Sequence, residues 1–495
     1  QELKIKRYIM NKISCFLPYA GKEQVEKTVN SLQATGLIEE IRLITTDATL
    51  ESLPDCEILF VDMPYSSATL KAIANAAKGE YTLLYTKETT LEMGMFALER
   101  MIHILEDSSA GMVYADHYQI ADGKQSNAPV IDYQFGSLRD DFNFGSLLLF
   151  NTEKLKEAAG HMKSDYNFAG LYDLRLKLSQ HSNLVHINEY LYSEVENDTR
   201  KSGEKIFDYV DPKNRDRQIE MEQACTEHLK EIGGYLAPEF KKIEFSAGNF
   251  EYEASVIIPV RNRIRTIRDA IKSVLMQKTD FKYNLIIIDN HSTDGTTEAI
   301  DEFKDDERVI HIIPERTDLG IGGCWNMGVH HPKCGKFAVQ LDSDDVYKDE
   351  NTLAIMVRAF YEQNCAMVVG TYMMTDFNMN MIAPGIIDHK EWTPANGRNN
   401  ALRINGLGAP RAFYTPVLRE VKVPNTSYGE DYALGLNFSR QYQIGRVYDV
   451  VYLCRRWDDN SDASLDIVKM NGHNLYKDRI RTWELQARIA MNKNK

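Results

Sequence analysis

Long apolar segments are missing from this 495-residue sequence. It contains no run of about 18 apolar residues, the length that a membrane-spanning helix requires. The first residues, QELKIKRYIMNKISCFLPYAG, also lack the apolar core of a signal peptide. We therefore expect a cytoplasmic protein without a transmembrane segment, for which peripheral contact with a membrane stays open.

Positive charge is scarce as well. The chain has 58 Lys and Arg residues against 72 Asp and Glu residues, which gives a formal net charge of -14. Nucleic-acid binding requires basic patches that neutralise phosphates. Nucleic acid is therefore not expected as a partner.

Cysteine is rare and scattered. The seven cysteines form no C-x-x-C pair, so neither a zinc site nor a disulfide framework is indicated. We expect them to be small buried apolar residues. With 43% apolar and 26% charged residues, the composition is that of an ordinary globular protein.

Two α/β segments follow each other along the chain. Apolar runs alternate with helical periodicity from Ile13 to about Tyr192, and the alternation resumes at Ala254, which predicts mostly parallel sheets. Between them, Asp211-Pro212 is a typical helix start and Gly233-Gly234 a typical stop. The expected domains are residues 10–198, a helical linker over 199–250, and residues 251–495 with a C-terminal helical extension.

The two segments also correspond in order, as four pairs of sequences show. SCFLPYAGKE (from Ser14) parallels SVIIPVRNRI (from Ser255), IRLITTDA parallels NLIIIDNHS, and NAAKGEYTLLYTKE parallels MGVHHPKCGKFAVQLDSD. The fourth pair is GLYDLRLKLS (from Gly170) and GEDYALGLNFS (from Gly429). This common order predicts an internal duplication with divergence.

The strongest chemical signal is KFAVQLDSDDVY. Its strand runs directly into Asp342, Ser343, Asp344 and Asp345, and carboxylates packed so closely repel one another unless a cation is present. Hard divalent ions prefer oxygen ligands, and Mg²⁺ typically uses one or two carboxylates plus substrate phosphates. The segment favours a metal-bound nucleotide diphosphate, and the alternative is a solvated acidic turn.

Three other segments place polar residues where a ligand could bind. The strand in ASVIIPVRNR stops at Pro259, and the strand in IIIDNHSTDGT ends at Asp289; ligands of open α/β sheets bind at such strand ends. Glu430-Asp431 in SYGEDYALGLNFS opens a predicted helix. The alternative for Asp289 and Asp431 is helix capping, which would explain only one of the two acids at 430 and 431.

Taken in order, SVIIPVRNR, IIIDNHSTDGT, WNMG, LDSDD, GED and CRRWDDNSDASL resemble the family 2 inverting glycosyltransferases, over roughly Ala254 to Leu465. The resemblance implies a Rossmann-like GT-A fold, the nucleotide-diphospho-sugar transferase fold, and hence two tandem GT-A domains. It implies metal-dependent (Mn or Mg) transfer from a UDP-sugar to a saccharide or lipid-linked glycan, with inversion. The enzyme would be a hexosyl- or N-acetylhexosaminyltransferase of cell-surface polysaccharide or glycoconjugate biosynthesis.

The resemblance also implies roles for individual residues. Asp342 and Asp344 would hold the metal and diphosphate, and Asp431 would be the catalytic base, with Glu430 as the neighbouring candidate. The residues expected to bind the nucleotide are Pro259, Asn262, Arg263, Asp289, Asp294, Asn326, Asp342 and Ser343.

Several positions depart from the family pattern. Trp325 replaces an arginine that many relatives have, and Arg455-Arg456-Trp457 replaces a metal-binding histidine, for which His473 is the substitute candidate. In the first half, Thr86-Lys87-Glu88 takes the place of the acidic motif, although Asp173 remains. We therefore expect the first half to be a degenerate GT-A domain that has lost donor binding.

Two other functions are compatible with paired aspartates on an α/β fold. A nucleotidyltransferase would carry a glycine-rich basic loop after its first strand, and the residues after Pro259 lack such glycines. A non-catalytic sugar-nucleotide or glycan-binding scaffold would have no need of Asp342, Asp344 and Asp431 together.

Overall fold

The structure is a computed structural model that describes residues 12–51, 53–196, 215–246, 248–390, 393–457 and 465–494. These residues divide into two compact units. The first contains residues 12–196, 215–233 and 466–482, and the second contains residues 234–465 and 483–494. The predicted helix start at Asp211-Pro212 lies outside the described residues.

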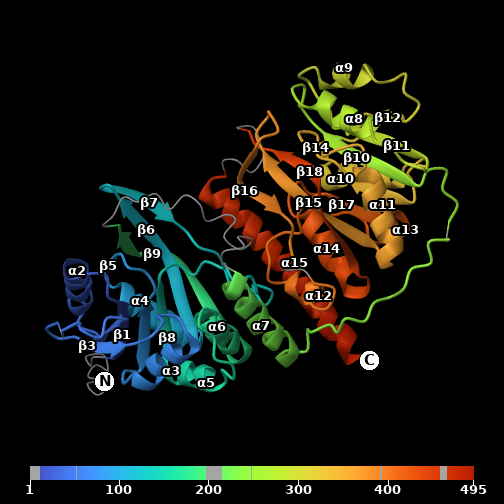
Figure 1. Ribbon diagram of the computed structural model, residues 1–495. Helices are drawn as coiled ribbons and strands as arrows, with labels where there is room; N and C mark the ends of the chain where they lie inside the picture. The colour runs from blue at the N-terminus through green and yellow to red at the C-terminus, as the bar shows by residue number, and fades with distance from the viewer. Residues whose placement is uncertain are drawn as a thin grey trace. The chain divides into compact units, whose positions relative to one another are not determined.

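The first unit is built on a nine-stranded mixed sheet (Figure 1). Its strands are β1 (Ile13–Pro18), β2 (Ile38–Thr45), β3 (Glu57–Phe60), β4 (Tyr81–Tyr85), β5 (Thr90–Met93), β6 (Met112–Ala121), β7 (Lys124–Ala128), β8 (Leu147–Asn151) and β9 (Leu184–Val195). Its helices are α2 (Lys22–Gln33), α3 (Ser67–Ala76), α4 (Ala97–Asp107), α5 (Thr152–Gly160), α6 (Gly170–His181), α7 (Arg215–Glu231) and the first part of α15 (Ile467–Lys493). The strand order is β3-β2-β1-β4-β8-β6-β9-β5, with β7 paired to β6.

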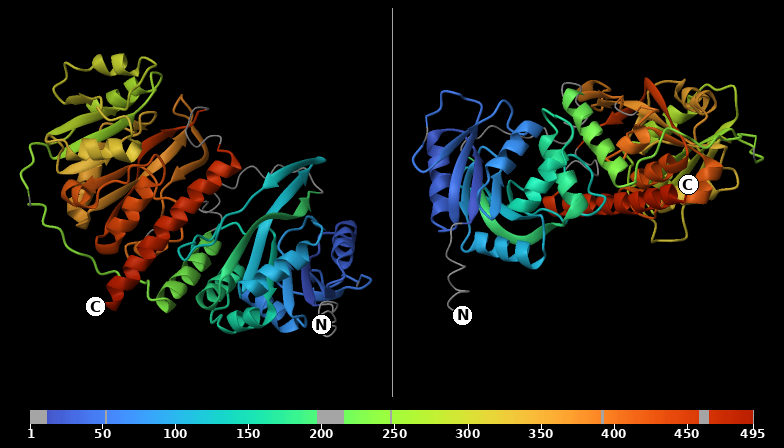
Figure 2. Two further views of the ribbon diagram at one scale, coloured as in Figure 1. Left: turned by 180° about the vertical axis from the view of Figure 1, so that it is seen from behind. Right: turned by 90° about the horizontal axis from the view of Figure 1, so that it is seen from below.

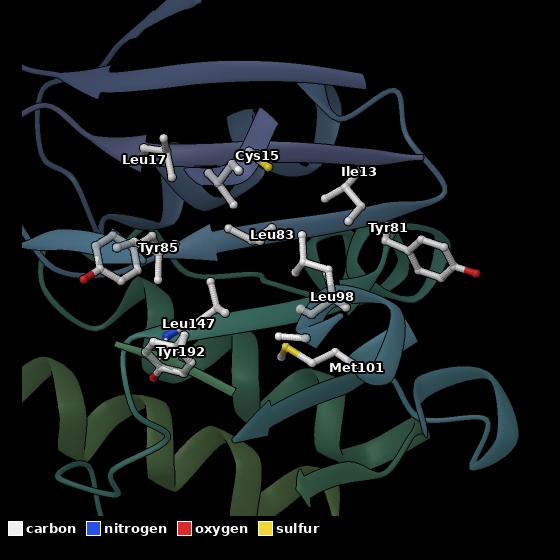
Figure 3. Close-up of a cluster of buried hydrophobic side chains, with 14 of the residues drawn as sticks. Ile13, Cys15, Leu17, Tyr81, Leu83, Tyr85, Leu98, Met101, Leu147 and Tyr192 are labelled. Atoms are coloured by element: carbon white, nitrogen blue, oxygen red, sulfur yellow. Dashed lines mark hydrogen bonds between the residues drawn. The ribbon is translucent and has the colours of Figure 1, made fainter. Parts of the chain in front are cut away.

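Helices cover both faces of this sheet because successive residues of each buried strand point to opposite sides. Cys15 and Leu17 of β1 pack with α2 and α4, as Figure 3 shows in part. Phe16, between them, packs with α3, α5 and α6 on the other face. The near-continuous apolar runs read from the sequence are therefore strands buried on both sides.

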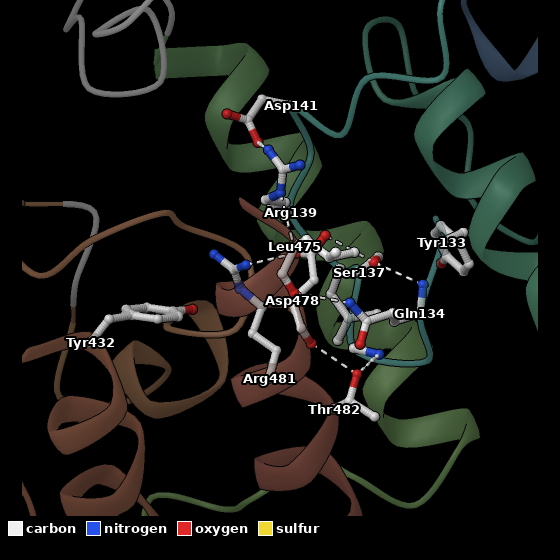
Figure 4. Close-up of polar contacts among 12 residues, drawn as sticks. Tyr133, Gln134, Ser137, Arg139, Asp141, Tyr432, Leu475, Asp478, Arg481 and Thr482 are labelled. Carbon is white, nitrogen blue, oxygen red and sulfur yellow. Dashed lines mark hydrogen bonds and ion pairs between the residues drawn. The ribbon is translucent and has the colours of Figure 1, made fainter. Parts of the chain in front are cut away.

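The first part of α15 is fixed to the first unit by a buried polar cluster around Asp478 (Figure 4). The Asp478 carboxylate is 0% exposed and lies 3.2 Å from Arg139 Nε and 2.8 Å from Arg481 Nη1. Ser137 Oγ donates to it at 3.0 Å, and Thr482 Oγ1 accepts the Gly136 N–H at 2.9 Å. The buried Asp478 carboxylate thus has two arginines and a hydroxyl group as partners, which offset the cost of burying its charge.

The second unit has the same construction (Figures 1 and 2). Its strands are β10 (Ala254–Val260), β11 (Tyr283–Asp289), β12 (Val309–Ile312), β13 (Phe337–Gln340), β14 (Val346–Tyr347), β15 (Met367–Thr375), β16 (Met381–Ile387), β17 (Arg411–Tyr414) and β18 (Ile444–Arg455). Its helices are α8 (Ile267–Leu275), α9 (Thr296–Asp301), α10 (Ile321–His330), α11 (Thr352–Gln363), α12 (Gly397–Asn400), α13 (Thr415–Val421), α14 (Glu430–Gln441) and the last part of α15. The strand order, β12-β11-β10-β13-β17-β15-β18-β14 with β16 on β15, repeats that of the first unit.

Individual contacts repeat along with the strand order. Ser14 Oγ accepts the Gly79 N–H at 2.8 Å, and Ser255 Oγ accepts the Gly335 N–H at 2.7 Å. The predicted α/β class, with two tandem Rossmann-like domains, is confirmed.

The duplication also corrects one alignment. The Tyr172 hydroxyl in α6 and the Tyr432 hydroxyl in α14 each donate to a backbone carbonyl of a preceding loop. Both tyrosines are the third residue of their helix. The helices therefore match with Leu171 opposite Asp431, and Asp173, the acid that remains in the first half, falls opposite Ala433.

The cysteines lie largely as their scatter predicts. All seven cysteines are free, and six of them are buried. No helix within the described ranges is both long and apolar enough to cross a membrane.

Candidate active site of the second unit

A pocket of about 210 Å³ lies in the second unit where parallel strands β10 and β13 end. Ligands of open α/β sheets bind at this carboxyl edge. Among the residues predicted from sequence, the pocket brings together Pro259, Arg263, Asp342, Ser343, Asp344, Glu430 and Asp431. The other lining residues are Ile321, Trp325, Gln340, Arg411, Phe413, Val423 and Leu434.

The acidic segment begins directly after β13, whose four residues are all buried. Gln340 at the end of the strand donates its amide to Asp342 Oδ1 at 2.9 Å, and the Asp342 N–H donates to the Tyr452 hydroxyl at 3.1 Å. Burial raises the pKa of Asp342; Arg411 opposes this shift and Asp344 adds to it. A cation bound at this cluster would therefore favour the ionised form of Asp342.

Asp345 has a structural place in the same turn. It is 4% exposed, and its Oδ1 accepts the Arg455 N–H at 2.8 Å. Burial, followed by repulsion from Asp344 and Asp342, raises the pKa of Asp345 well above its ordinary value. Asp345 thus fixes the turn to β18, while Asp342 and Asp344 face the pocket.

The side chains of Arg263 and Trp457 lie next to Asp344. Its side chain is 16% exposed, with Arg263 Nε 3.9 Å from Oδ2. The Trp457 indole N–H donates to the same oxygen at 3.4 Å, and the Arg263 guanidinium lies 5.9 Å from the Trp457 ring centre. The Arg455-Arg456-Trp457 segment, a departure from the family pattern, thus contributes Trp457 to the acidic site; residues 458–464 of the late motif lie outside the described residues.

Helix α14 presents Asp431 to the pocket. Gly429 precedes the helix with φ of 79°, a left-handed conformation that glycine adopts without strain. Asp431 Oδ2 lies 2.9 Å from Arg411 Nη1, and its Oδ1 accepts the N–H of Tyr432 at 2.7 Å. This ion pair fixes the carboxylate in one orientation.

Arg411 is the central basic residue of the site. Burial disfavours its charge, but Asp431, Asp342 and Glu430 together raise the pKa of Arg411 above its ordinary value. Its backbone N–H donates to Gln340 Oε1 at 3.1 Å. Arg411 thus connects the acidic turn after β13 with the acid at the start of α14.

Glu430 differs from its neighbour in its protonation. Burial, and then the charge of Asp431, raise the pKa of Glu430 to about 8. Its Oε2 is buried and has no hydrogen-bond partner among the described residues. At neutral pH one side chain of the pair is therefore a neutral acid beside a carboxylate that Arg411 neutralises.

Four predicted nucleotide-binding residues hold the loops around the pocket and do not line it. Asp289 is 0% exposed and accepts hydrogen bonds from Ser292 N at 3.1 Å and Thr297 Oγ1 at 2.5 Å. Asn262, Asp294 and Asn326 accept backbone N–H groups of Thr293, Ile264 and Val423, respectively. Asp289 thus fixes its loop and the Thr297 side chain; it does not cap α9, whose N-cap Gly295 has no side-chain cap hydrogen bond.

His473 belongs to the first unit by its position in α15. The pocket of the second unit is therefore made without it. Burial lowers the pKa of His473, and Lys469 and Lys477 add to this shift.

Sequence analysis did not find Arg411, Gln340 or Phe413. Arg411 is the only charged residue of the short strand RAFY, and a charge at the start of an otherwise apolar strand was the available signal. Its partners come from β13 and α14, so only the antiparallel pairing of β13 with β17 brings them together.

The donor set suits a hard divalent cation. Asp342, Ser343 and Asp344 offer two carboxylates and a hydroxyl on one turn. In the part of the chain that the structure describes, no group of three or more His, Cys, Asp or Glu side chains is spaced to hold a metal ion. Such a cation would therefore complete its coordination with substrate phosphates and water, as Mg²⁺ commonly does.

The Rossmann-like sheet places a carboxylate pair at one strand end and a further carboxylate across the same pocket. This arrangement is typical of nucleotide-dependent group transferases. The sequence profile of the family described as Glycosyl transferase family 2 matches residues 255–412. The match confirms the recognition made from the motifs. The match includes Asp342, Asp344 and Arg411 and stops before α14.

Two similar curated proteins are described as glycosyltransferases. An uncharacterized glycosyltransferase of Rickettsia felis is 37% identical over 39% of this chain and 31% of its own length. Glycosyltransferase GlyG of Streptococcus pneumoniae is 27% identical over 25% of this chain and 40% of its own length. The chain thus spans about a third of the length of these curated relatives.

Among solved structures, S. aureus TarS 1-349 in complex with UDP-GlcNAc is 19% identical. The likeness covers 48% of this chain and 72% of that one, with a TM-score of 0.36. It is too distant to bear on function.

Proposed function

We propose that the second unit transfers a sugar from a nucleotide sugar, a UDP-sugar, to a hydroxyl group of a saccharide or lipid-linked glycan, with inversion. One observation carries the proposal: Asp342, Asp344 and Asp431 line a single pocket, with Arg411 between the acidic turn and Asp431. The family match over residues 255–412 supports the donor class. The sugar would be a hexose or an N-acetylhexosamine, and the product part of a cell-surface polysaccharide or glycoconjugate.

The acidic turn would bind the donor. Asp342 and Asp344 would hold Mn²⁺ or Mg²⁺ against the diphosphate, and such an ion, when bound, neutralises charge on the leaving nucleotide. Arg263 lies beside Asp344 and would place a second positive charge near the phosphates. Ser343, 8% exposed, would contribute its hydroxyl to the same cradle.

Asp431 would act as the general base. In the proposed step it takes the proton of the acceptor hydroxyl while that oxygen forms a bond to the anomeric carbon. The bond from this carbon to the diphosphate breaks on the opposite face, so the configuration inverts. Trp325, Phe413 and Leu434 line the pocket beside Asp431 and would pack against the apolar face of a sugar ring.

Arg411 and Glu430 would set the protonation of this base. The ion pair to Arg411 at 2.9 Å favours an ionised Asp431 before the acceptor arrives. The neutral form of Glu430, whose pKa lies at about 8, avoids a second negative charge beside it. Adjacent acids held in different protonation states are typical of acid-base catalysis.

The test is release of free nucleotide from a panel of UDP-sugars, with Mn²⁺ or Mg²⁺, measured with and without saccharide acceptors. Metal-dependent nucleotide release that Asp344→Asn abolishes supports the proposal. Donor binding without any turnover across the panel would instead indicate the non-catalytic scaffold. Pyrophosphate release from a nucleoside triphosphate and a sugar phosphate would indicate a nucleotidyltransferase.

A further inference from the structure

The first unit contains an apolar pocket of about 320 Å³. This volume lies within the range of small-molecule sites, roughly 300–1,000 Å³. Its aromatic lining comes from six side chains: Tyr65, Phe142, Phe144, Phe150, Phe168 and Tyr172. Methionine and leucine side chains from β6, β8, α6 and α7 add to the apolar wall. The polar residues of the lining are Thr86, Asp140, Asn167, Arg175 and Arg217.

This pocket is the counterpart of the site in the second unit. The pairing of β4 with β8 matches that of β13 with β17, which places Phe150 opposite Phe413. The matched helices α6 and α14 place Leu174 opposite Leu434. Both members of each pair line their own pockets.

Three charged groups of the second site are replaced in the first, whereas Glu88 keeps a carboxylate at the position of Asp344. Leu148 stands at the position of Arg411, and Leu171 at that of Asp431. Thr86 replaces Asp342 at the end of the central strand. The pocket of the first unit lies at the same place in the fold, but it lacks counterparts of Arg411, Asp431 and Asp342.

Two charged side chains around the pocket, Arg175 and Glu220, are engaged in the protein. Arg175 is 5% exposed; it donates to the Ser137 carbonyl at 2.7 Å and faces the Tyr172 ring at 4.7 Å. At the start of α6, Glu220 accepts the backbone N–H groups of Asn167, Phe168 and Ala169. These three residues precede the first turn of α6, so an anion there would meet the Glu220 carboxylate.

The end of the site that corresponds to the donor cradle is also closed. Lys87, at the position of Ser343, lies 2.6 Å from Glu194 Oε2, and His117 lies 3.2 Å from the other oxygen. Glu194 is 1% exposed, and burial opposes its charge, but His117 and Lys87 lower the pKa of Glu194 to about 2. Lys87, the basic residue at this end, is thus paired with a buried carboxylate of its own unit.

We propose that the first unit binds a flexible hydrocarbon chain, alkyl or isoprenoid, in this pocket. A chain without charge or hydrogen-bonding groups matches walls of aromatic, leucine and methionine side chains, and methionine adapts to irregular apolar shapes. A sugar would bring hydroxyl groups that the aromatic, leucine and methionine walls leave without partners. The inference stands on the first unit alone and does not depend on glycosyl transfer by the second.

The test is calorimetric titration of the full chain with n-hexanol, n-octanol and n-decanol. Burial of each methylene group is worth about 0.8 kcal/mol, so the affinity should rise by up to about fourfold per methylene. Leu171→Asp introduces, in the first unit, the acid that the second unit has as Asp431. An aspartate is tolerated in the first turn of a helix, so the fold should persist. Decanol binding should weaken at least tenfold. Phe168→Ser, on the 37% exposed rim residue, should weaken binding without affecting the fold.

The matched control is Phe60→Ser, because Phe60 is 52% exposed in the same unit and lies outside the pocket lining; decanol affinity should not change. Decyl maltoside below its micellar concentration identifies the source of the chain. Binding equal to that of decanol indicates the tail of a head-group-bearing lipid, and binding of decanol alone indicates a free chain. The proposal is overturned if no alcohol binds saturably, if affinity is independent of chain length, or if Leu171→Asp binds decanol as the wild type does.

Discussion

Replacement of Asp431 by asparagine separates a catalytic base from a helix cap and from a metal ligand. Asparagine has nearly the same shape, so its amide oxygen can still accept the Tyr432 N–H, which Asp431 accepts at 2.7 Å. It cannot take a proton from an acceptor hydroxyl. General-base catalysis contributes about 10²- to 10⁴-fold, which corresponds to about 2.7–5.4 kcal/mol of barrier at 1.36 kcal/mol per factor of ten.

The same change also removes the ion pair with Arg411. The two side chains are 14% and 27% exposed, so the loss lies between that of a surface pair and that of a buried pair. Arg411 keeps the Gly408 carbonyl and the charge of Asp342. We expect a loss of about 1–2 kcal/mol in the free energy of unfolding, which is small against a typical total of about 5–15 kcal/mol.

The assay is initial-rate transfer at saturating donor, together with donor titration in the presence of metal. Asp431→Asn should reduce transfer at least about 100-fold and leave donor affinity within a few-fold. Asp173→Asn, in the first turn of α6, is the matched control and should leave the rate unchanged. Transfer within tenfold of wild type would refute the base assignment and direct attention to Glu430, and loss of donor binding would show that Asp431 is a ligand.

Asp344→Asn should abolish transfer and weaken UDP binding at least tenfold, because the cation loses a carboxylate of the acidic turn, and an excess of chelator should have the same effect. Full activity in chelator would contradict the metal assignment. Asp349→Asn is the control. Glu430 has a folded-state pKa of about 8, above its ordinary 4.5, so its contribution to stability is complete below about pH 4.5 and is lost as pH rises through 8. Urea unfolding of the metal-free protein at pH 5 and 8.5 should show this decrease in wild type and a smaller one in Glu430→Gln; equal decreases would refute the assignment. Asp478→Ala leaves Arg139 and Arg481 buried without their carboxylate and should lower the free energy of unfolding by about 3–5 kcal/mol, whereas Asp141→Ala, on a side chain 49% exposed, should cost less than about 1 kcal/mol.

The sequence predicted features that depend on local order. Strand β13 runs directly into Asp342 and Asp344, so their position at the carboxyl edge follows from adjacency alone. Alternating apolar runs predicted both sheets. The duplication was visible because four segments kept their order, and the repeated strand order confirms it.

Features that depend on side-chain direction could not be predicted in the same way. A polar residue at a strand end can face the crevice or its own loop, and Asp289 faces its loop because Ser292, Thr297 and His311 surround it. Arg411 acquires its role only through strand pairing. The shift that brings Leu171, and not Asp173, opposite Asp431 follows from where each helix begins.

The division of α15 has a consequence for how the chain folds during synthesis. Residues 466–482, which include Asp478, belong to the first unit, yet they are translated after the whole sheet of the second unit. Until they leave the ribosome, Arg139 has Asp141 but lacks its buried partner Asp478, and Leu475 is absent from the apolar cluster against which it packs. The first unit is thus completed only after most of the second has been made, and the second unit is completed by residues 483–494, which follow. A fragment that ends near residue 198 therefore lacks part of the first unit and cannot report the properties of that unit in the intact protein.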